Sequence, residues 1–136
     1  MRTGGQILVD ALRAQGADFA FGVPGESYLA VLDALHDTPD LKFVICRQEG
    51  GASMMADAYG KMTGNPGICF VTRGPGATNA SAGVHIAQQD STPMILFIGQ
   101  VARQQGNLTL LQQAYRAVLE GRTSMSEVQR VFQPKK

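Results

Sequence analysis

The sequence lacks the features that mark several large classes of protein. It contains no tryptophan and only two cysteines, Cys46 and Cys69, which are too few for a disulfide scaffold. No apolar run approaches the roughly 20 residues that cross a bilayer, and Asp10 and Arg13 interrupt the apolar stretch that a signal peptide would need. These absences predict a protein of the reduced cytoplasm that has no membrane partner.

The sequence also lacks an excess of charge of either sign. Twelve lysine and arginine side chains balance eleven aspartates and glutamates, which gives a net charge of +1 over 136 residues. We therefore expect no basic surface that would bind nucleic acid, and a hydrophobic content of 44% argues against disorder. A chain of this length is typical of a single compact domain.

Glycine is abundant, with sixteen residues in total, of which fourteen precede residue 104. Between these glycines, helical and extended patterns alternate along the chain. Short apolar runs at 19–21, 41–46, 68–71 and 93–98 predict strands, and helical spacing predicts helices at 3–15, from an N-cap at Ser27 to Thr38, at 49–63 and at 77–88.

This alternation predicts an α/β fold with three layers, α/β/α, around an open parallel sheet of about four strands. The runs 68–71 and 94–98 are continuously apolar, which favours strands that are covered on both faces. In such sheets, ligands bind beyond the carboxyl ends of the strands. Those ends are predicted at 22–25, 47–51, 72–76 and 99–100.

The character of the sequence changes after Arg103. Residues 104–136 contain only two glycines and carry five basic against two acidic side chains. Their apolar spacing predicts two helices, and Ser124 with Glu127 forms a capping box at the start of the second. We therefore expect a domain at 1–103 followed by a helical tail at 104–136.

Two common kinds of site match the sequence poorly. Gly74-Pro75-Gly76 follows a predicted strand and opens a helix, but Asn79 replaces the third glycine of a dinucleotide-binding fingerprint. A stand-alone nucleotide binder therefore stays a weak alternative. No metal site is predicted, because His36 and His85 have no cysteine or histidine at ligand spacing.

Glu49 lies at one of the predicted strand ends and begins a helix. An acidic residue in the first turn stabilises a helix by roughly 0.3–1 kcal/mol, so helix capping explains its position without any ligand. The neighbouring Gly50 and Gly51 favour the close approach of something flat, which capping does not need. Both interpretations stay open at this point.

Five motifs occur in order along residues 1–103. They are Gly22-Val23-Pro24-Gly25, the run from Arg47 to Ala52, the run from Met55 to Gly64, the run from Val71 to Ala80, and the run from Asp90 to Val101. Together they resemble the N-terminal, pyrimidine-binding domain of thiamine-diphosphate enzymes, and most of all the acetolactate synthase branch. The resemblance implies that thiamine diphosphate binds through its pyrimidine end and that small 2-keto acids are the substrates.

The resemblance also implies roles for individual residues. In the family, the glutamate at the position of Glu49 hydrogen-bonds a ring nitrogen of the aminopyrimidine and favours the imino tautomer that deprotonates the thiazolium carbon. That role needs a desolvated carboxyl group, and Met54 and Met55 are expected to form an apolar wall near it. Further cofactor-binding positions are Pro75 and Asn79 in the cleft, Gln100 facing the substrate, and Gly25, which leaves room for it.

The sequence departs from the family pattern in two ways. Family members often carry His-Glu-Gln where this chain has Gln48-Glu49-Gly50, so the substrate stays open. The Gly-Asp-Gly motif that marks the family's second domain, which holds the diphosphate and Mg²⁺, does not occur in this sequence. We therefore expect Mg²⁺ to bind only through a partner domain or subunit and the isolated chain to be inactive. A homodimer is also expected, because the unpaired edge of a shortened parallel sheet favours dimerisation. The alternative is a non-catalytic, truncated or fused module that acts in assembly.

Overall fold

Four parallel strands form the middle layer of the structure, a computed structural model that describes residues 2–100. The strands are β1 (Phe19–Gly22), β2 (Lys42–Ile45), β3 (Gly67–Thr72) and β4 (Met94–Gly99). Their order in the sheet is β2-β1-β3-β4, and every neighbouring pair is parallel. The prediction of an open parallel sheet of four strands is confirmed.

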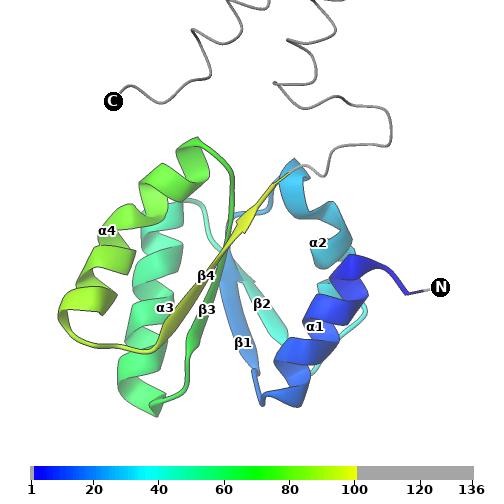
Figure 1. Cartoon of the computed structure of the whole chain (residues 1–136), viewed down its shortest axis with the longest axis horizontal. Coiled ribbons are helices and arrows are strands. Elements are labelled where there is room, and N and C mark those ends of the chain that lie inside the picture. The colour runs from blue at the N-terminus through cyan, green and yellow to red at the C-terminus, as the bar shows by residue number, and fades with distance from the viewer. Residues whose placement is uncertain (1, 101–136) are drawn as a thin grey trace, which may run out of the picture. The chain divides into compact units, whose positions relative to one another are not determined.

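Helices cover both faces of this sheet, as Figure 1 shows. One face carries α1 (Gly4–Ala14), the short 3-10 helix η1 (Glu26–Tyr28) and α2 (Leu29–His36), and the other carries α3 (Glu49–Thr63) and α4 (Pro75–Gln89). α1 packs against α2, and α3 packs against α4. The predicted three-layer α/β/α architecture is therefore confirmed.

Two apolar cores fill the spaces between the layers. Strand β3 contributes to both, because its successive side chains point to opposite faces of the sheet and Ile68, Cys69, Phe70 and Val71 are at most 3% exposed. The core beneath α1 and α2 contains Val9, Leu12, Ala20, Tyr28, Ala34, Leu35, Leu41, Ile68 and Phe70. The core beneath α3 and α4 contains Ala52, Ala56, Cys69, Val71 and Ala80.

Strand β4 differs from the prediction that both of its faces are covered. Ile95 is 41% exposed and Ile98 is 51% exposed. The physical reason is the position of β4 at one edge of the described sheet, where it pairs only with β3. Continuous apolarity identified β4 as a strand, but it did not indicate how far each face is covered.

Glycines allow α3 to approach the sheet and α4 closely. A Cβ atom added at Gly67 of β3 would lie 1.9 Å from the carbonyl oxygen of Ala56 in α3. A Cβ atom added at Gly83 of α4 would lie 2.2 Å from Oγ of Ser53. Gly83 therefore serves the close packing of α4 against α3.

The second helix begins later than expected. α2 starts at Leu29, and its N-cap residue Tyr28 makes no side-chain capping bond. The prediction that Ser27 caps this helix is wrong, because Ser27 lies in η1 and its Oγ atom is 2.7 Å from Oγ1 of Thr72. Ser27 therefore bonds a residue that is distant in the sequence, Thr72, and not the backbone at the start of α2.

The predicted tail at 104–136, with its two helices, lies outside the described residues. Within residues 2–100, no helix has the length and apolar character that a membrane crossing requires.

Candidate functional site

The candidate site lies where the strands end at their carboxyl edge. The chain leaves β1 into the turn that contains Gly25, leaves β3 into Arg73 and Gly74, and leaves β4 at Gln100. Gly74 has a φ of +60° and precedes Pro75 at the start of α4, so the turn requires a glycine at this position. Glu49 lies on the segment that follows β2. The five residues predicted to form the site therefore come from four separate chain segments.

Glu49 is the first residue of α3, but it does not cap that helix. The N-cap is Gln48, whose Oε1 atom accepts a hydrogen bond from the backbone nitrogen of Gly51 at 2.7 Å. The capping that one interpretation assigned to Glu49 is thus supplied by its neighbour. Glu49 still interacts favourably with the helix dipole, because it is an acidic residue in the first turn. Since Gln48 makes the capping bond, both carboxylate oxygens of Glu49 can bond other groups.

The Glu49 carboxylate points toward α4 and the glycine turn. Its Oε2 atom accepts a hydrogen bond from Nδ2 of Asn79 at 3.0 Å. Its Oε1 atom lies 3.5 Å from the position that a Cβ atom would take at Gly76. The side chain is half-buried, with one side covered by the protein and the other open. Two of the predicted residues, Glu49 and Asn79, are therefore in direct contact.

Pro75 and Gln100 line one cavity of about 550 Å³ at the ends of β3 and β4. Both side chains are exposed. The remaining lining residues are Glu26, Thr72, Arg73 and Gly74, and Nη2 of Arg73 donates to Oε1 of Glu26 at 3.2 Å. The two predicted residues thus line the same cavity, and its other lining residues include an ion pair.

Thr72 lies at the centre of these segments. A Cβ atom added at Gly25 would lie 3.0 Å from Cβ of Thr72, and one added at Gly76 would lie 2.8 Å from its Cγ2 atom. Its Oγ1 atom bonds Ser27. The space beside Gly25 is therefore filled by Thr72 rather than left open. Sequence reasoning missed Thr72, although its place at the end of a buried strand directly before the glycine turn was a usable signal.

Tyr28 holds the turn after β1. Its hydroxyl donates to the carbonyl oxygen of Val23 and also lies 3.5 Å from the carbonyl oxygen of Phe70. Burial raises the pKa of the Tyr28 phenol to about 12, and the nearby Cys69 thiol and Glu49 carboxyl add smaller contributions in the same direction. This buried hydroxyl therefore stays protonated and fixes the turn that contains Gly25.

The chain can now be compared with known proteins. Residues 2–123 match a family model described as the thiamine pyrophosphate enzyme, N-terminal TPP binding domain. The chain belongs to the thiamine pyrophosphate enzyme family. The match to this family's N-terminal domain extends beyond residue 103, where the motifs that carry the resemblance end.

Curated relatives of this thiamine pyrophosphate enzyme domain are acetolactate synthases. The chain is 45% identical over 104 residues to the acetolactate synthase large subunit of Parasynechococcus marenigrum. This alignment covers 74% of this chain and 17% of the relative. It is 46% identical over 99 residues to the isozyme 2 large subunit of Escherichia coli, and 43% identical over 99 residues to the mitochondrial catalytic subunit of Saccharomyces cerevisiae. These alignments cover 73% of this chain and 18% and 14% of the respective relatives. The chain thus spans less than a fifth of the length of these relatives.

Two glycines of this thiamine pyrophosphate enzyme domain differ in what surrounds them. A Cβ atom added at Gly50 would lie 3.2 Å from the carbonyl oxygen of Asn79, so Gly50 serves the close approach of α3 to α4 rather than that of a flat ligand. Gly51 is exposed, with only Oε1 of Gln48 near it at 3.9 Å. The predicted apolar wall is partly open, since Met54 is 46% and Met55 is 49% exposed.

Proposed function

We propose that this chain forms the pyrimidine-binding part of an acetolactate-synthase-like enzyme that decarboxylates and joins small 2-keto acids. The observation that carries the proposal is the position of the Glu49 carboxylate at the strand ends, with Oε2 bonded to Asn79 and Oε1 beside Gly76. Membership of the thiamine pyrophosphate enzyme family supports thiamine diphosphate as the cofactor. The acetolactate synthase relatives support the substrate class.

The residues at this edge fit an aminopyrimidine ring. Within residues 2–100, Oε1 of Glu49 has no hydrogen-bond partner, so it is available to a ring nitrogen. The carboxylate is only half-buried in this chain. A docked ring and a partner domain would exclude the remaining water, and a carboxyl group without water exchanges a proton with a ring nitrogen more effectively.

Each candidate residue then has a separate task. Glu49 holds a proton at Oε1 and exchanges it with the ring nitrogen, which is general acid–base work for a carboxyl group. Asn79 fixes the carboxylate through Oε2. When bound, thiamine diphosphate supplies the electron sink for cleavage of the bond beside the keto group. Pro75 gives the cleft a rigid wall, Gln100 faces the substrate, and Gly25 lets its turn pack against Thr72.

A second domain or subunit supplies the site for the diphosphate and Mg²⁺. Within residues 2–100, no group of three or more histidine, cysteine, aspartate or glutamate side chains is arranged to hold a metal ion. The relatives are large subunits that continue well beyond the matched segment. We propose that this chain is inactive alone, works with a diphosphate- and Mg²⁺-binding partner, and pairs as a homodimer.

A chimera tests the proposal. The 99 residues of the Escherichia coli isozyme 2 large subunit that match this chain are replaced by the matching residues of this chain. We expect pyruvate consumption that depends on thiamine diphosphate and Mg²⁺, and a fall in kcat of about 10²- to 10⁴-fold for Glu49→Gln. Asp33→Asn, on the exposed side of α2, is the control and leaves kcat unchanged.

Two results would overturn parts of this proposal. An active chimera in which Glu49→Gln keeps the parent kcat removes the role of Glu49. A folded chimera that binds thiamine diphosphate in a calorimetric titration but consumes no 2-keto acid favours the non-catalytic module.

A further inference from the structure

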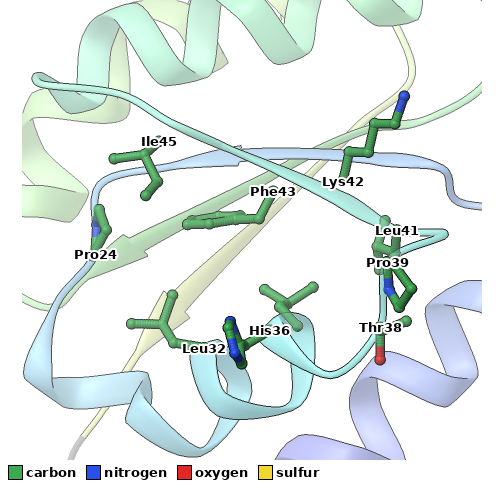
Figure 2. Close-up of a pocket in the computed structure, with 10 residues that line it drawn as sticks. Pro24, Leu32, His36, Thr38, Pro39, Leu41, Lys42, Phe43 and Ile45 are labelled. Atoms are coloured by element: carbon green, nitrogen blue, oxygen red, sulfur yellow. The ribbon is translucent and has the colours of Figure 1, made fainter.

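A second cavity lies away from the candidate site, between α2 and the outer strand β2. Its volume is about 430 Å³. Figure 2 shows how its walls are arranged, with Phe43 in the middle, Leu32 and His36 from α2 on one side and Ile45 from β2 on the other. Ten residues line the cavity. Seven of these ten side chains are apolar, so the cavity suits an apolar side chain.

The backbone beside this cavity has hydrogen-bonding groups without a strand partner. β2 is the outer strand of the described sheet and pairs only with β1. The backbone nitrogens of Lys42 and Cys46 donate to Asp18 and Gly22, toward β1. Because successive residues of a strand alternate in direction, the N–H groups of Phe43 and Ile45 face the opposite side, where the described sheet has no further strand.

The same two residues, Phe43 and Ile45, also line the cavity with their side chains. Ile45 is 69% exposed, more than any other large apolar residue of the described strands. An open strand edge with an adjoining apolar cavity is the combination that proteins use to bind extended peptides by strand addition. In that mode, the backbone bonds give affinity and the cavity accepts alternate side chains of the peptide.

The charge near this edge indicates what the intervening side chain should be. Lys42 is exposed, and its amino group points away from the cavity in Figure 2 and lies 5.5 Å from the centre of the Phe19 ring on the opposite face of the sheet. It forms no salt bridge within residues 2–100, whereas Arg13, Lys61 and Arg73 all do. An acidic side chain opposite Lys42 would therefore complete a cross-strand ion pair.

We propose that the outer edge of β2 binds an extended peptide segment of a partner protein, which adds a strand to the sheet. Apolar side chains at alternate positions of that segment enter the cavity beside Phe43 and Ile45, and an acidic side chain between them pairs with Lys42. A lysine on an edge strand also discourages aggregation, but that task accounts for Lys42 alone and not for the cavity.

The test titrates the full chain with a fluorescein-labelled peptide of about eight residues in which isoleucine and glutamate alternate. A second peptide carries lysine in place of glutamate, and a third is the acidic peptide with alternate backbone nitrogens methylated. We expect saturable binding of the acidic peptide alone, measured by fluorescence anisotropy. In ¹⁵N NMR spectra, the amide signals of Phe43 and Ile45 should shift upon binding.

Protein variants locate the binding edge. Lys42→Glu should weaken binding of the acidic peptide by up to about fivefold and strengthen binding of the lysine peptide. Ile45→Thr should weaken binding by about five- to tenfold, because less apolar surface is buried. The matched control Ile95→Thr, on the exposed face of the opposite edge strand β4, should leave the affinity unchanged.

Three outcomes would overturn the proposal. The first is the absence of saturable binding up to about 1 mM peptide, which would leave Lys42 only a role in guarding the edge. The second is binding that Ile95→Thr weakens and Ile45→Thr does not. The third is a chain that is dimeric by light scattering and becomes monomeric with Ile45→Thr, which would assign the edge to a second copy.

Discussion

The amide nitrogen of Asn79 donates to Oε2 of Glu49 at 3.0 Å and so joins the first turn of α3 to the second turn of α4. The two residues are 30 positions apart in the chain, and only the packing of one helix against the other brings them together. This bond fixes the carboxylate at the edge of the sheet where the cofactor is proposed to bind. It also makes Asn79 the residue through which the placement of Glu49 can be tested.

Replacing Asn79 should affect activity more than stability. Asn79 is exposed, so Asn79→Leu should change the free energy of unfolding by no more than about 0.5 kcal/mol. In the active chimera, loss of the bond to Glu49 should lower kcat by about tenfold or more, because misplaced catalytic groups are costly. Ser81→Ala, exposed on the same helix, is the control. Equal kcat for Asn79→Leu and Ser81→Ala would contradict the positioning role.

Two glycine substitutions should have opposite effects on stability. Gly67→Ala forces a methyl group to within 1.9 Å of the Ala56 carbonyl oxygen and should destabilise the fold by about 1–3 kcal/mol or more. Gly51→Ala lies in α3 with open space around it and should stabilise the fold by about 0.4–1 kcal/mol. Urea unfolding followed by circular dichroism measures both values. A Gly67→Ala variant that is as stable as the parent would show that backbone movement relieves the close packing at Gly67.

Stability should fall in alkaline solution. Burial raises the pKa of Cys69 from 9.0 to about 12 and that of Tyr28 from 10.0 to about 12. The native state therefore keeps protons that the unfolded chain releases. The stability that each group contributes is complete below its unfolded pKa and is lost as the pH rises toward 12. Each group should lower the free energy of unfolding by about 1.4 kcal/mol per pH unit within its window.

This slope is measured by urea unfolding at a series of values between about pH 8 and 11. Cys69→Ala should make the decline shallower from about pH 9 upward, and Tyr28→Phe should do so from about pH 10. An unchanged slope in both variants would show that other groups cause the alkaline loss.

The hydroxyl groups of Ser27 and Thr72 should be energetically coupled. Their oxygens lie 2.7 Å apart in a partly buried position, so Ser27→Ala and Thr72→Val should each cost about 0.5–1.5 kcal/mol. A double-mutant cycle should give a coupling of at least about 0.5 kcal/mol. The control cycle pairs Ser27→Ala with Thr78→Val, whose hydroxyl bonds the carbonyl oxygen of Gly74, and should give no coupling. Equal coupling in both cycles would indicate a diffuse effect on folding.

Local signals made most of the fold predictable. Helix α3 was expected at 49–63, and it occupies those residues because Gly64 ends it with a φ of +74°. Strand β3 was predicted from its continuous apolarity, which the burial of both faces explains. Burial at the edges was harder to predict, because the exposure of Ile95 depends on the place of β4 in the sheet and not on its own residues.

The site was predictable as a region but not as a set of contacts. The rule that ligands bind beyond the carboxyl ends of parallel strands selected the segments that carry the candidate site, and the family motifs selected Glu49 and Asn79. Their mutual hydrogen bond could not be predicted, since it depends on how closely α3 and α4 approach. The same holds for Thr72, whose importance comes from contacts with Gly25 and Gly76 that are far apart in sequence.

The central position of β3 in the sheet has a consequence for deuterium exchange. β3 is paired on both sides, with β1 and β4, and its apolar side chains are almost completely buried, so its amides should exchange only when the whole domain opens. β2 and β4 lie at the edges of the sheet formed by residues 2–100 and should exchange through smaller, more frequent openings. The turn that carries Gly76 begins at the end of β3, the slowest-exchanging strand. Transient fraying at the β4 edge therefore leaves the contact of Glu49 with Gly76 intact, whereas an opening of β2 reaches the segment that leads directly to Glu49.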